Sequence, residues 1–511
     1  MGASRTENSL RNAVFSVFGY VLNIALTFAV RTFFINYLKE DYLGVNGLFT
    51  NILSMLNLAE MGLGTAIIFK LYKPLASNDT EKIKQLMSFY KTAYRIIALI
   101  IAVVGLCLLP FLQFLIKESP DIAENMKIVY LLYLTNSVVS YLLIYKKSLI
   151  VADQKEYLTS IINYAYLTVM SVAQILILVF THNFLLFLIV QIFCSILQNV
   201  VISLLCDKKY PYIVKNKSKL PKEDQKPIFK DVRALVLYRI SAIVINGTDN
   251  IIMSKFIGLT IVGIYSNYYL IVHSVFNLIK QFVRALGASV GNMSTTKDVE
   301  KKYLVYNSTN LMNSWLIGTC SICFFVILNP FIALWAGDKL LLSELPMFLI
   351  VFNFYITGIA QVFDLFRNSF GLFVQGQLRP VISSIINLVL SIILVQYMGI
   401  VGVLLGTTAA QLSINIWYDP LVVHRHVFKR SPFPFYMRNL LYLLLCFLNG
   451  FICKTITSFI KINSSVLELM VKAVVVFVLS NLIFLGYYFR TKEFKFLKQQ
   501  LLFAVKKLLK K

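Results

Sequence analysis

The sequence predicts an all-α, polytopic membrane protein with about 14 transmembrane helices. The first observation is the length of its apolar stretches, each able to cross a hydrocarbon core of roughly 30 Å as a helix of about 20 residues. The second is that lysines and arginines gather in every second gap between these stretches. The third is a composition of 58% hydrophobic and 14% charged residues, which excludes a soluble enzyme or a disordered scaffold because so few charges cannot cover a globular surface.

The predicted helices follow one another along the whole chain. The first apolar stretch is much longer than the roughly 7–15-residue core of a cleavable signal, so we expect it to remain as the first span. In chain order, the predicted spans cover residues 12–37, 43–69, 89–116, 127–146, 158–180, 184–206, 233–257, 259–284, 303–335, 345–371, 381–398, 400–423, 437–459 and 465–489.

The distribution of basic residues predicts the orientation. Roughly 40 of the 49 lysines and arginines fall on one side of the membrane when the amino terminus is placed inside, and about six fall on the other. Both termini are therefore predicted to be cytoplasmic. The same bias accounts for the formal net charge of +25 without any nucleic acid partner, because cytoplasmic loops face an anionic leaflet.

One long polar connection divides the chain into two six-span halves. In order, the predicted parts are an N-lobe over residues 1–206, a cytoplasmic linker over 207–232, a C-lobe over 233–424, spans 13 and 14 within 425–489, and a basic amphipathic cytoplasmic tail over 490–511. The tail carries apolar residues at three- and four-residue steps among its lysines, so we expect it to lie on the inner leaflet.

The two halves echo each other at their first hairpins. The segments Tyr37–Gly44 and Phe256–Gly263 each join the first and second span of a half through a short turn, with glycine at the matching place. Because six spans restore the same orientation, the halves are predicted to form a parallel repeat about a pseudo-twofold axis along the membrane normal.

Cysteine usage indicates no redox or metal chemistry. All seven cysteines lie in or at the ends of apolar segments, so no disulfide is implied. Cys320 and Cys323 have the spacing of a redox or zinc pair, but a metal site would need further ligands, and a three-residue step also places two small residues on one helix face. We expect no metal, no other cofactor and no catalytic residues.

Polar residues follow single helical faces in five of the predicted spans. An ionised side chain at mid-bilayer costs at least about 2.5–3.5 kcal/mol on insertion scales, so charges inside spans usually face other helices or water. The stripes consist of Ser16, Tyr20, Asn23, Thr27 and Arg31; Asn51, Ser54, Asn57 and Glu60; Tyr238, Ser241, Thr248 and Asp249; His273, Asn277, Lys280 and Arg284; and Asn353, Thr357, Gln361, Asp364, Arg367 and Asn368. We expect them to converge on a hydrated interior.

The charged members of these stripes predict a cavity for an anionic ligand. Cationic groups in a partly hydrated cleft suit a diphosphate, because a guanidinium matches phosphate oxygens in a two-pronged fashion. The predicted substrate-binding residues are Arg31, Arg284, Arg367, His273, Asn23 and Asn277. The predicted ion-coupling carboxylates are Asp249, Glu60 and Asp364. Gly247 is the predicted hinge, since glycine loosens a helix.

Purely structural roles stay open for several of these residues. Arg284 is also compatible with an anchor at the inner interface, and Glu60 with a pair to a basic neighbour. His273 is also compatible with a hydrogen-bonded core residue. Arg31 and Asp249 are also compatible with a structural ion pair between helices.

Several short motifs together carry a family resemblance. They are Arg31–Phe34 with Tyr42–Phe49, Leu58–Gly64 leading to Tyr72–Leu75, Ala152–Lys155, Asn246–Asn250 with Ser254–Gly258, Gly263–Tyr268, and Asn329–Phe331 with Leu334–Trp335. With these motifs the chain resembles, over nearly its whole length, the Wzx-like bacterial polysaccharide flippases. These belong to the polysaccharide transporter family of the multidrug/oligosaccharidyl-lipid/polysaccharide exporter (MOP) superfamily.

The resemblance implies two six-helix lobes around a central cavity that moves an undecaprenyl diphosphate-linked oligosaccharide from the inner to the outer leaflet of the bacterial cell membrane. It implies alternating access coupled to an H⁺ or Na⁺ gradient, in the assembly of exopolysaccharide or capsule. The expected partners are the lipid-linked oligosaccharide, membrane lipids, a polysaccharide polymerase and glycosyltransferases. Arg31 and Asp249 lie within the matching motifs, whereas the other charged candidates rest on periodicity alone.

Other functions remain open. A flippase for a peptidoglycan precursor or a teichoic acid unit has the same requirements. A multidrug or cation antiporter of the same superfamily would want an acidic, aromatic-lined cavity, which the basic stripes disfavour. A membrane-embedded polysaccharide polymerase needs a catalytic constellation at a membrane face, for which the outer links are too short. We therefore expect a transporter and not an enzyme.

Overall fold

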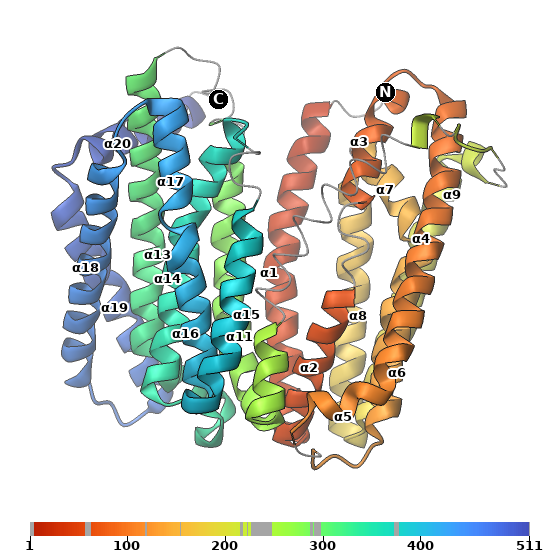
Figure 1. Cartoon of the computed structure of the whole chain (residues 1–511), viewed down its shortest axis with the longest axis horizontal. Coiled ribbons are helices and arrows are strands. Elements are labelled where there is room, and N and C mark those ends of the chain that lie inside the picture. The colour runs from red at the N-terminus through yellow and green to blue at the C-terminus, as the bar shows by residue number, and fades with distance from the viewer. Residues whose placement is uncertain are drawn as a thin grey trace. The chain divides into compact units, whose positions relative to one another are not determined.

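The computed structural model describes residues 5–56, 63–117, 120–153, 155–214, 218–221, 223–225, 248–286, 290, 298–372 and 378–509. Within these ranges the regular elements are all helices (Figure 1). In the same ranges, eleven helices are long and apolar enough to cross a membrane, or twelve if the bent pair α6 (Met126–Tyr141) and α7 (Ile144–Ala152) forms one span. The predicted all-α polytopic membrane fold is confirmed. The predicted spans 43–69 and 233–257 lie partly outside the described residues.

The chain divides into two compact units, Met1–Gly263 and Ile264–Lys511. The first unit contains the predicted N-lobe and also the segment 248–263. Helix α11 (Leu259–Ala285) therefore begins in the first unit and continues in the second. The predicted boundaries of the lobes and the linker stay predictions.

The first unit is a helical bundle built around α1, α8 and α9. Its helices are α1 (Arg5–Tyr37), α2 (Glu40–Leu56), α3 (Leu63–Ala76), α4 (Thr80–Leu108), α5 (Leu112–Leu115), α6, α7, α8 (Glu156–Thr181) and α9 (Phe184–Lys209). Helix α1 packs on α8, and α8 packs on α9. The α1–α8 contact is close because Gly19 faces the ring of Tyr164, where a Cβ atom would lie 1.7 Å from a ring carbon. The carboxylate of Asp79 caps α4 by accepting from the Lys82 amide at 2.9 Å.

A polar network attaches the short helix α7 to α9. The Lys146 ammonium pairs with Asp207 at 2.6 Å and donates to the Ser203 hydroxyl at 2.7 Å. The Tyr210 hydroxyl donates to Asp153 at 2.6 Å. Burial, followed by the hydrogen bond to Asp153, raises the pKa of Tyr210 well above its usual value. The phenol therefore remains a donor, and the network holds α7 against α9 after the 41° bend that separates α7 from α6.

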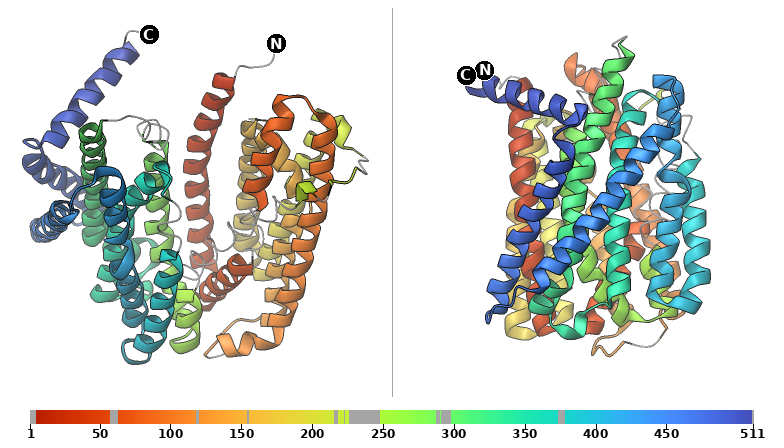
Figure 2. Two further views of the ribbon diagram at one scale, coloured as in Figure 1. Left: turned by 45° about the horizontal axis from the view of Figure 1, so that its top comes forward. Right: turned by 90° about the vertical axis from the view of Figure 1, so that its left-hand side faces the viewer.

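The second unit is a bundle centred on the long helix α13. Its helices are the main part of α11, then α13 (Val299–Ala336), α14 (Glu344–Ser369), α15 (Arg379–Met398), α16 (Ile400–Ala410), the π-helical turn η6 (Gln411–Asn415), α17 (Tyr418–Val423), the π-helical turn η7 (His424–Phe428), α18 (Phe433–Ser458), α19 (Ser465–Tyr488) and α20 (Lys492–Leu509). Helices α18 and α19 pack on α13 and on each other (Figure 2).

The tail forms the predicted helix, and its first turn is attached to the bundle. The Arg438 guanidinium of α18 pairs with Glu493 of α20 at 2.6 Å. The rings of Trp315 in α13 and Phe494 in α20 lie 6.0 Å apart between their centroids. The start of the tail is thus held by α13 and α18, and its position on the inner leaflet stays a prediction.

Helices α15 and α16 form the closest hairpin of the second unit. Gly399 makes the turn between them with a φ of 55°, a conformation that favours glycine. A Cβ atom at Gly402 would lie 2.3 Å from backbone atoms of Leu394, and one at Gly406 would lie 2.3 Å from the Ser391 hydroxyl oxygen. Glycine at both positions therefore lets the two backbones touch, as small residues do in membrane helices.

Replacing Gly402 with alanine should force the α15–α16 hairpin apart, because the new methyl group meets backbone that cannot rotate away. We expect a loss of about 1–3 kcal/mol of stability, as for other overpacked sites. Thermal unfolding of the detergent-solubilised protein measures it. The matched control is Gly486→Ala in α19, where no atom lies within 4 Å of the added Cβ. Equal unfolding temperatures for the two variants would contradict this packing.

Candidate functional site

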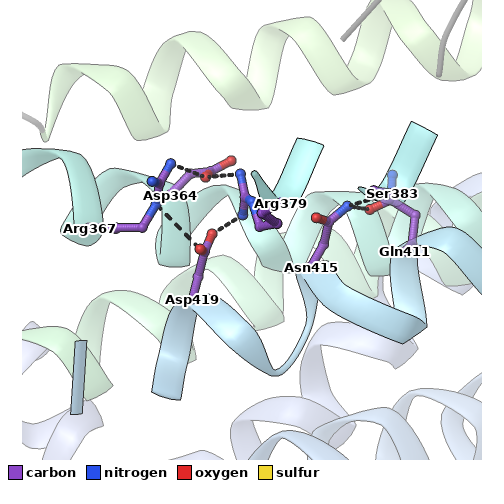
Figure 3. Close-up of polar contacts among 7 residues, drawn as sticks. All are labelled: Asp364, Arg367, Arg379, Ser383, Gln411, Asn415 and Asp419. Atoms are coloured by element: carbon purple, nitrogen blue, oxygen red, sulfur yellow. Dashed lines mark hydrogen bonds and ion pairs between the residues drawn. The ribbon is translucent and has the colours of Figure 1, made fainter. Parts of the chain in front are cut away.

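Two aspartates and two arginines form a closed ring of ion pairs inside the second unit (Figure 3). Arg379 pairs with Asp364 at 2.8 Å and also with Asp419. Arg367 pairs with Asp419 at 3.3 Å and with Asp364 at 3.4 Å. Each guanidinium therefore bridges both carboxylates, and the four formal charges sum to zero.

The local sequence brings these four side chains together from three helices. Asp364 and Arg367 are three residues apart on α14, so they share one face of that helix. Arg379 is the first residue of α15 and is followed by Pro380, which favours a helix start. Asp419 lies in α17, just beyond the π-helical turn η6. A π-helical turn shifts the helical register, and such turns are frequent at functional sites.

The ring is buried except at one corner. The side chain of Asp419 is 0% exposed, that of Arg367 is 3% exposed and that of Arg379 is 7% exposed. The Asp364 side chain is 39% exposed. Desolvation of buried charges costs several kcal/mol per ion, so each buried member depends on its partners. Asp364 is the one member of the ring whose side chain is partly exposed at the surface of the unit.

A row of neutral polar groups extends from the ring (Figure 3). The Asn415 amide donates to the Gln411 side-chain carbonyl at 2.6 Å and to the Ser383 hydroxyl at 3.5 Å. On α14, one turn before Asp364, both side-chain polar atoms of Gln361 are buried with no hydrogen-bond partner among the described residues. Polar groups thus continue from the ring along α14, α15 and η6.

This arrangement can respond to a cation. A proton or a sodium ion that binds Asp364 competes with the two guanidiniums for the same carboxylate oxygens. Arg367 and Arg379 would then share Asp419 alone, and the balance of charge between α14, α15 and α17 would change. The ring therefore has the chemistry of a switch whose accessible corner is Asp364.

An apolar groove is a second feature of this unit. It lies between α13, α14 and α18 and has a volume of about 330 Å³. Aromatic side chains dominate its lining, among them Phe325, Phe348, Phe352, Phe447 and Phe451. The groove suits a hydrocarbon chain because most of its lining side chains are apolar.

The structure places the predicted residues of the first unit on separate elements. Arg31 is half-buried in α1, in electrostatic contact with Tyr133 of α6, whose hydroxyl donates to Asn46 of α2. Asn23 is half-buried two turns earlier on α1 and accepts a long hydrogen bond of 3.4 Å from Thr27. Asp249 is buried within the helical residues 248–256.

The second unit contains the remaining predicted residues that the structure describes. Asp364 and Arg367 meet in the ring. His273 and Asn277 of α11 form a pair, with 2.9 Å between the Asn277 amide nitrogen and the His273 Nδ1 atom. The Arg284 side chain, Glu60 and Gly247 lie outside the described residues. The substrate-binding, ion-coupling and hinge roles of all these residues stay predictions, as does the shared cavity.

Sequence reasoning missed Arg379 and Asp419. Asp419 is a lone acid within the predicted span 400–423, and an intramembrane carboxylate needs a partner. Arg379 lies just before the predicted span 381–398, which is the position typical of an arginine that anchors a helix at the membrane interface. The unpaired acid in that span was the signal: a partner for Asp419 had to come from another helix, and Arg379 is that partner.

Replacing Asp419 with asparagine should leave two buried guanidiniums with a single carboxylate. Breaking a buried ion pair by removing one partner costs about 3–5 kcal/mol, so we expect a lower unfolding temperature in detergent. The control is Asp338→Asn, at an exposed position, which should unfold like the wild type. A wild-type unfolding temperature for Asp419→Asn would show that the ring does not stabilise the fold.

Comparison with known proteins shows what fold the chain has. The sequence matches no protein-family model and no curated protein. Solved structures do match. The lipid II flippase MurJ in an inward closed conformation has a TM-score of 0.67 and 15% identity over 94% of this chain and 98% of MurJ.

Two transporters of the MATE family give a similar result. An inward-facing MATE transporter of the MOP superfamily has a TM-score of 0.62 and 15% identity over 80% of this chain and 96% of its own. A MATE transporter from Vibrio cholerae has a TM-score of 0.56 and 13% identity over 84% of this chain and 99% of its own. The chain therefore has the fold that transporters and flippases of the MOP superfamily share.

Proposed function

We propose that the protein is a flippase that moves an isoprenoid diphosphate-linked oligosaccharide from the inner to the outer leaflet of a bacterial cell membrane, for surface polysaccharide assembly. The observation that carries this proposal is Arg31, a half-buried arginine inside a membrane-spanning bundle, close to the polar side chains of Tyr133 and Asn46. An arginine at this depth is costly and is usually functional. Its planar guanidinium suits a phosphate ligand.

The apolar groove supports a ligand with a hydrocarbon tail. Its aromatic lining between α13, α14 and α18 offers no charge to bind a polar headgroup. A lipid-linked substrate has two chemically distinct ends, so it needs a polar site for the diphosphate and an apolar surface for the chain. The protein carries candidates for both within its membrane spans.

The physical task explains why such a substrate needs a protein. Moving a sugar diphosphate through hydrocarbon would expose phosphate charges and hydroxyl groups at several kcal/mol each. A polar interior that opens to one side at a time replaces the lost water. Alternating access of this kind suits a fold built from two repeated bundles.

The ring of ion pairs supports coupling to an ion gradient. We assign the coupling carboxylate to Asp364, because it is the exposed corner of an otherwise buried, charge-balanced cluster. Asp249 and Glu60 remain further candidates. Proton or sodium binding at Asp364 would weaken its bonds to Arg367 and Arg379, and so relate ion occupancy to the packing of α14 against α15.

A peptidoglycan-precursor flippase is the second candidate, since the MurJ structure with a TM-score of 0.67 is that of a lipid II flippase. The two functions differ in the sugar that is moved. They share the diphosphate and the isoprenoid chain, so the residues discussed above serve either one.

Depletion of the protein should identify the substrate. We expect a lipid-linked oligosaccharide of surface polysaccharide to accumulate on the cytoplasmic side, because its synthesis continues while its transfer stops. Complementation with Arg31→Ala should fail at wild-type membrane abundance, whereas the control Arg490→Ala, at an exposed arginine, should restore export. Accumulation of lipid II instead would favour the second candidate. Normal export by Arg31→Ala would remove Arg31 from the mechanism.

Asp364→Asn should uncouple transport from the ion gradient, because the amide no longer exchanges a proton or binds sodium at neutral pH. Export rates measured at several pH values and sodium concentrations should lose the dependence that the wild type shows. Asp338→Asn, at an exposed aspartate, is the control and should keep it. An unchanged dependence in Asp364→Asn would exclude this carboxylate as the coupling group.

A further inference from the structure

Two short turns in the first compact unit match each other residue by residue. In the first turn, α1 ends at Tyr37 and α2 begins at Glu40. In the second, helical residues 248–256 end at Phe256 and α11 begins at Leu259. The two positions where a helix ends, 37 and 256, and the two positions where the next helix begins, 40 and 259, are separated by the same number of residues. The two turns that match in sequence therefore also match in the positions of their helix ends.

The matched turns touch each other reciprocally. A Cβ atom added to Gly44 would lie 2.2 Å from the carbonyl oxygen of Leu259. One added to Gly263 would lie 3.1 Å from the carbonyl oxygen of Glu40. Gly44 corresponds to Gly263, and Glu40 corresponds to Leu259. Each glycine thus packs on the first residue of the other helix, which is the pattern of a twofold contact.

A hydrogen bond joins the positions next to this contact. The Thr260 hydroxyl donates to the Asp41 carboxylate at 3.1 Å, and residues 41 and 260 are themselves a matched pair. A local twofold axis therefore passes between them. We call the contact of Gly44, Gly263, Asp41 and Thr260 the glycine joint.

The segment before α11 is fastened to the rest of the first unit. The other carboxylate oxygen of Asp41 accepts from the Asp121 amide at 2.7 Å. The Ser254 hydroxyl donates to the Leu115 carbonyl at 2.8 Å, and the Lys117 amide donates to the Ser254 carbonyl at 3.2 Å. Beyond Gly263, α11 continues into the second unit. Any movement of α11 relative to α2 must therefore pass through the glycine joint.

On the basis of the transport cycle proposed above, we propose that the glycine joint is a latch that is closed in the state seen here and opens in the opposite state. Both turns lie at helix ends and are predicted at the outer face, where alternating access requires an opening in one of its states. Opening of the latch is a displacement of the start of α11 away from α2. The joint is suited to repeated opening because its closest contacts are made by backbone atoms at two glycines. Two glycines allow the close approach that seals it.

A reversible cross-link tests whether the latch must open. In Asp41→Cys/Thr260→Cys, the two thiols replace side chains that are joined by a hydrogen bond of 3.1 Å. We expect oxidation in membranes to link residues 41 and 260, to stop export, and to allow export again after reduction. The single variants Asp41→Cys and Thr260→Cys, treated in the same way, are the controls.

Two results would overturn the latch. One is full export by the oxidised, cross-linked protein. The other is a well-expressed double variant that forms no cross-link. The cross-link yield is read on the protein alone, by a mobility shift or by mass spectrometry. Failure of the proposed substrate therefore leaves the proximity measurement intact, since the yield needs no assumption about what is transported, and only the export measurement depends on the proposed function.

Added bulk tests the role of the glycines separately. In the double-cysteine background, Gly44→Ala should lower the cross-link yield strongly, because its methyl group would meet a backbone oxygen at 2.2 Å. Gly263→Ala should lower it less, since the nearest atoms lie 3.1 Å away. Gly486→Ala should not change it. Equal yields for Gly44→Ala and Gly486→Ala, at equal membrane abundance, would show that close glycine packing does not hold the joint.

Discussion

The cost of placing a charge in hydrocarbon is the constraint on which the rest of this structure depends. An ion at the centre of a bilayer is costly, so the chain confines most lysines and arginines to alternate loops. The charges that remain inside the membrane must be balanced or hydrated. Asp364, Arg367, Arg379 and Asp419 satisfy this requirement as a neutral ring with three buried members. The start of α15 positions Arg379, and the π-helical turn η6 precedes Asp419, so that both side chains meet Asp364 and Arg367.

Close packing of helices is the second requirement, because lipid removes the hydrophobic effect as a force between them. The protein meets it with glycine. Gly402 and Gly406 bring α16 onto the backbone of α15, and Gly44 brings α2 onto the start of α11. In each case a methyl group would collide with atoms that have little freedom to move. Such glycine contacts fix which helix surfaces can meet, although each contact involves few atoms.

The sequence predicted the helices well because periodicity and apolar length respond directly to the bilayer. Spans such as 184–206 and 465–489 correspond to α9 and α19 with ends shifted by three residues or fewer. The predicted span 400–423 was only partly correct, since it is divided into α16, η6 and α17 and continues through η7 to Phe428. The hydrophobic pattern of the sequence does not predict a π-helical turn, because such a turn depends on how the helix packs against its neighbours.

The candidate site was half predictable for a related reason. Asp364 and Arg367 lie one helical turn apart, and their pairing follows from spacing alone. Arg379 and Asp419 are separated by 40 residues and meet only because the α15–α16 hairpin returns the chain to the same level. Partners from different helices depend on hairpin geometry, which the sequence encodes through Gly399 and Gly402 rather than through the charged residues themselves.

The ring and the glycine joint differ in the interactions that hold them. The ring is buried at three of its four members and is held by charge, because each guanidinium bridges both carboxylates. The joint is held by close backbone packing and by the hydrogen bond from Thr260 to Asp41. Helix α11 starts in the joint and ends within the unit that contains the ring. The joint and the ring therefore lie in different compact units, and α11 is the helix that belongs to both units.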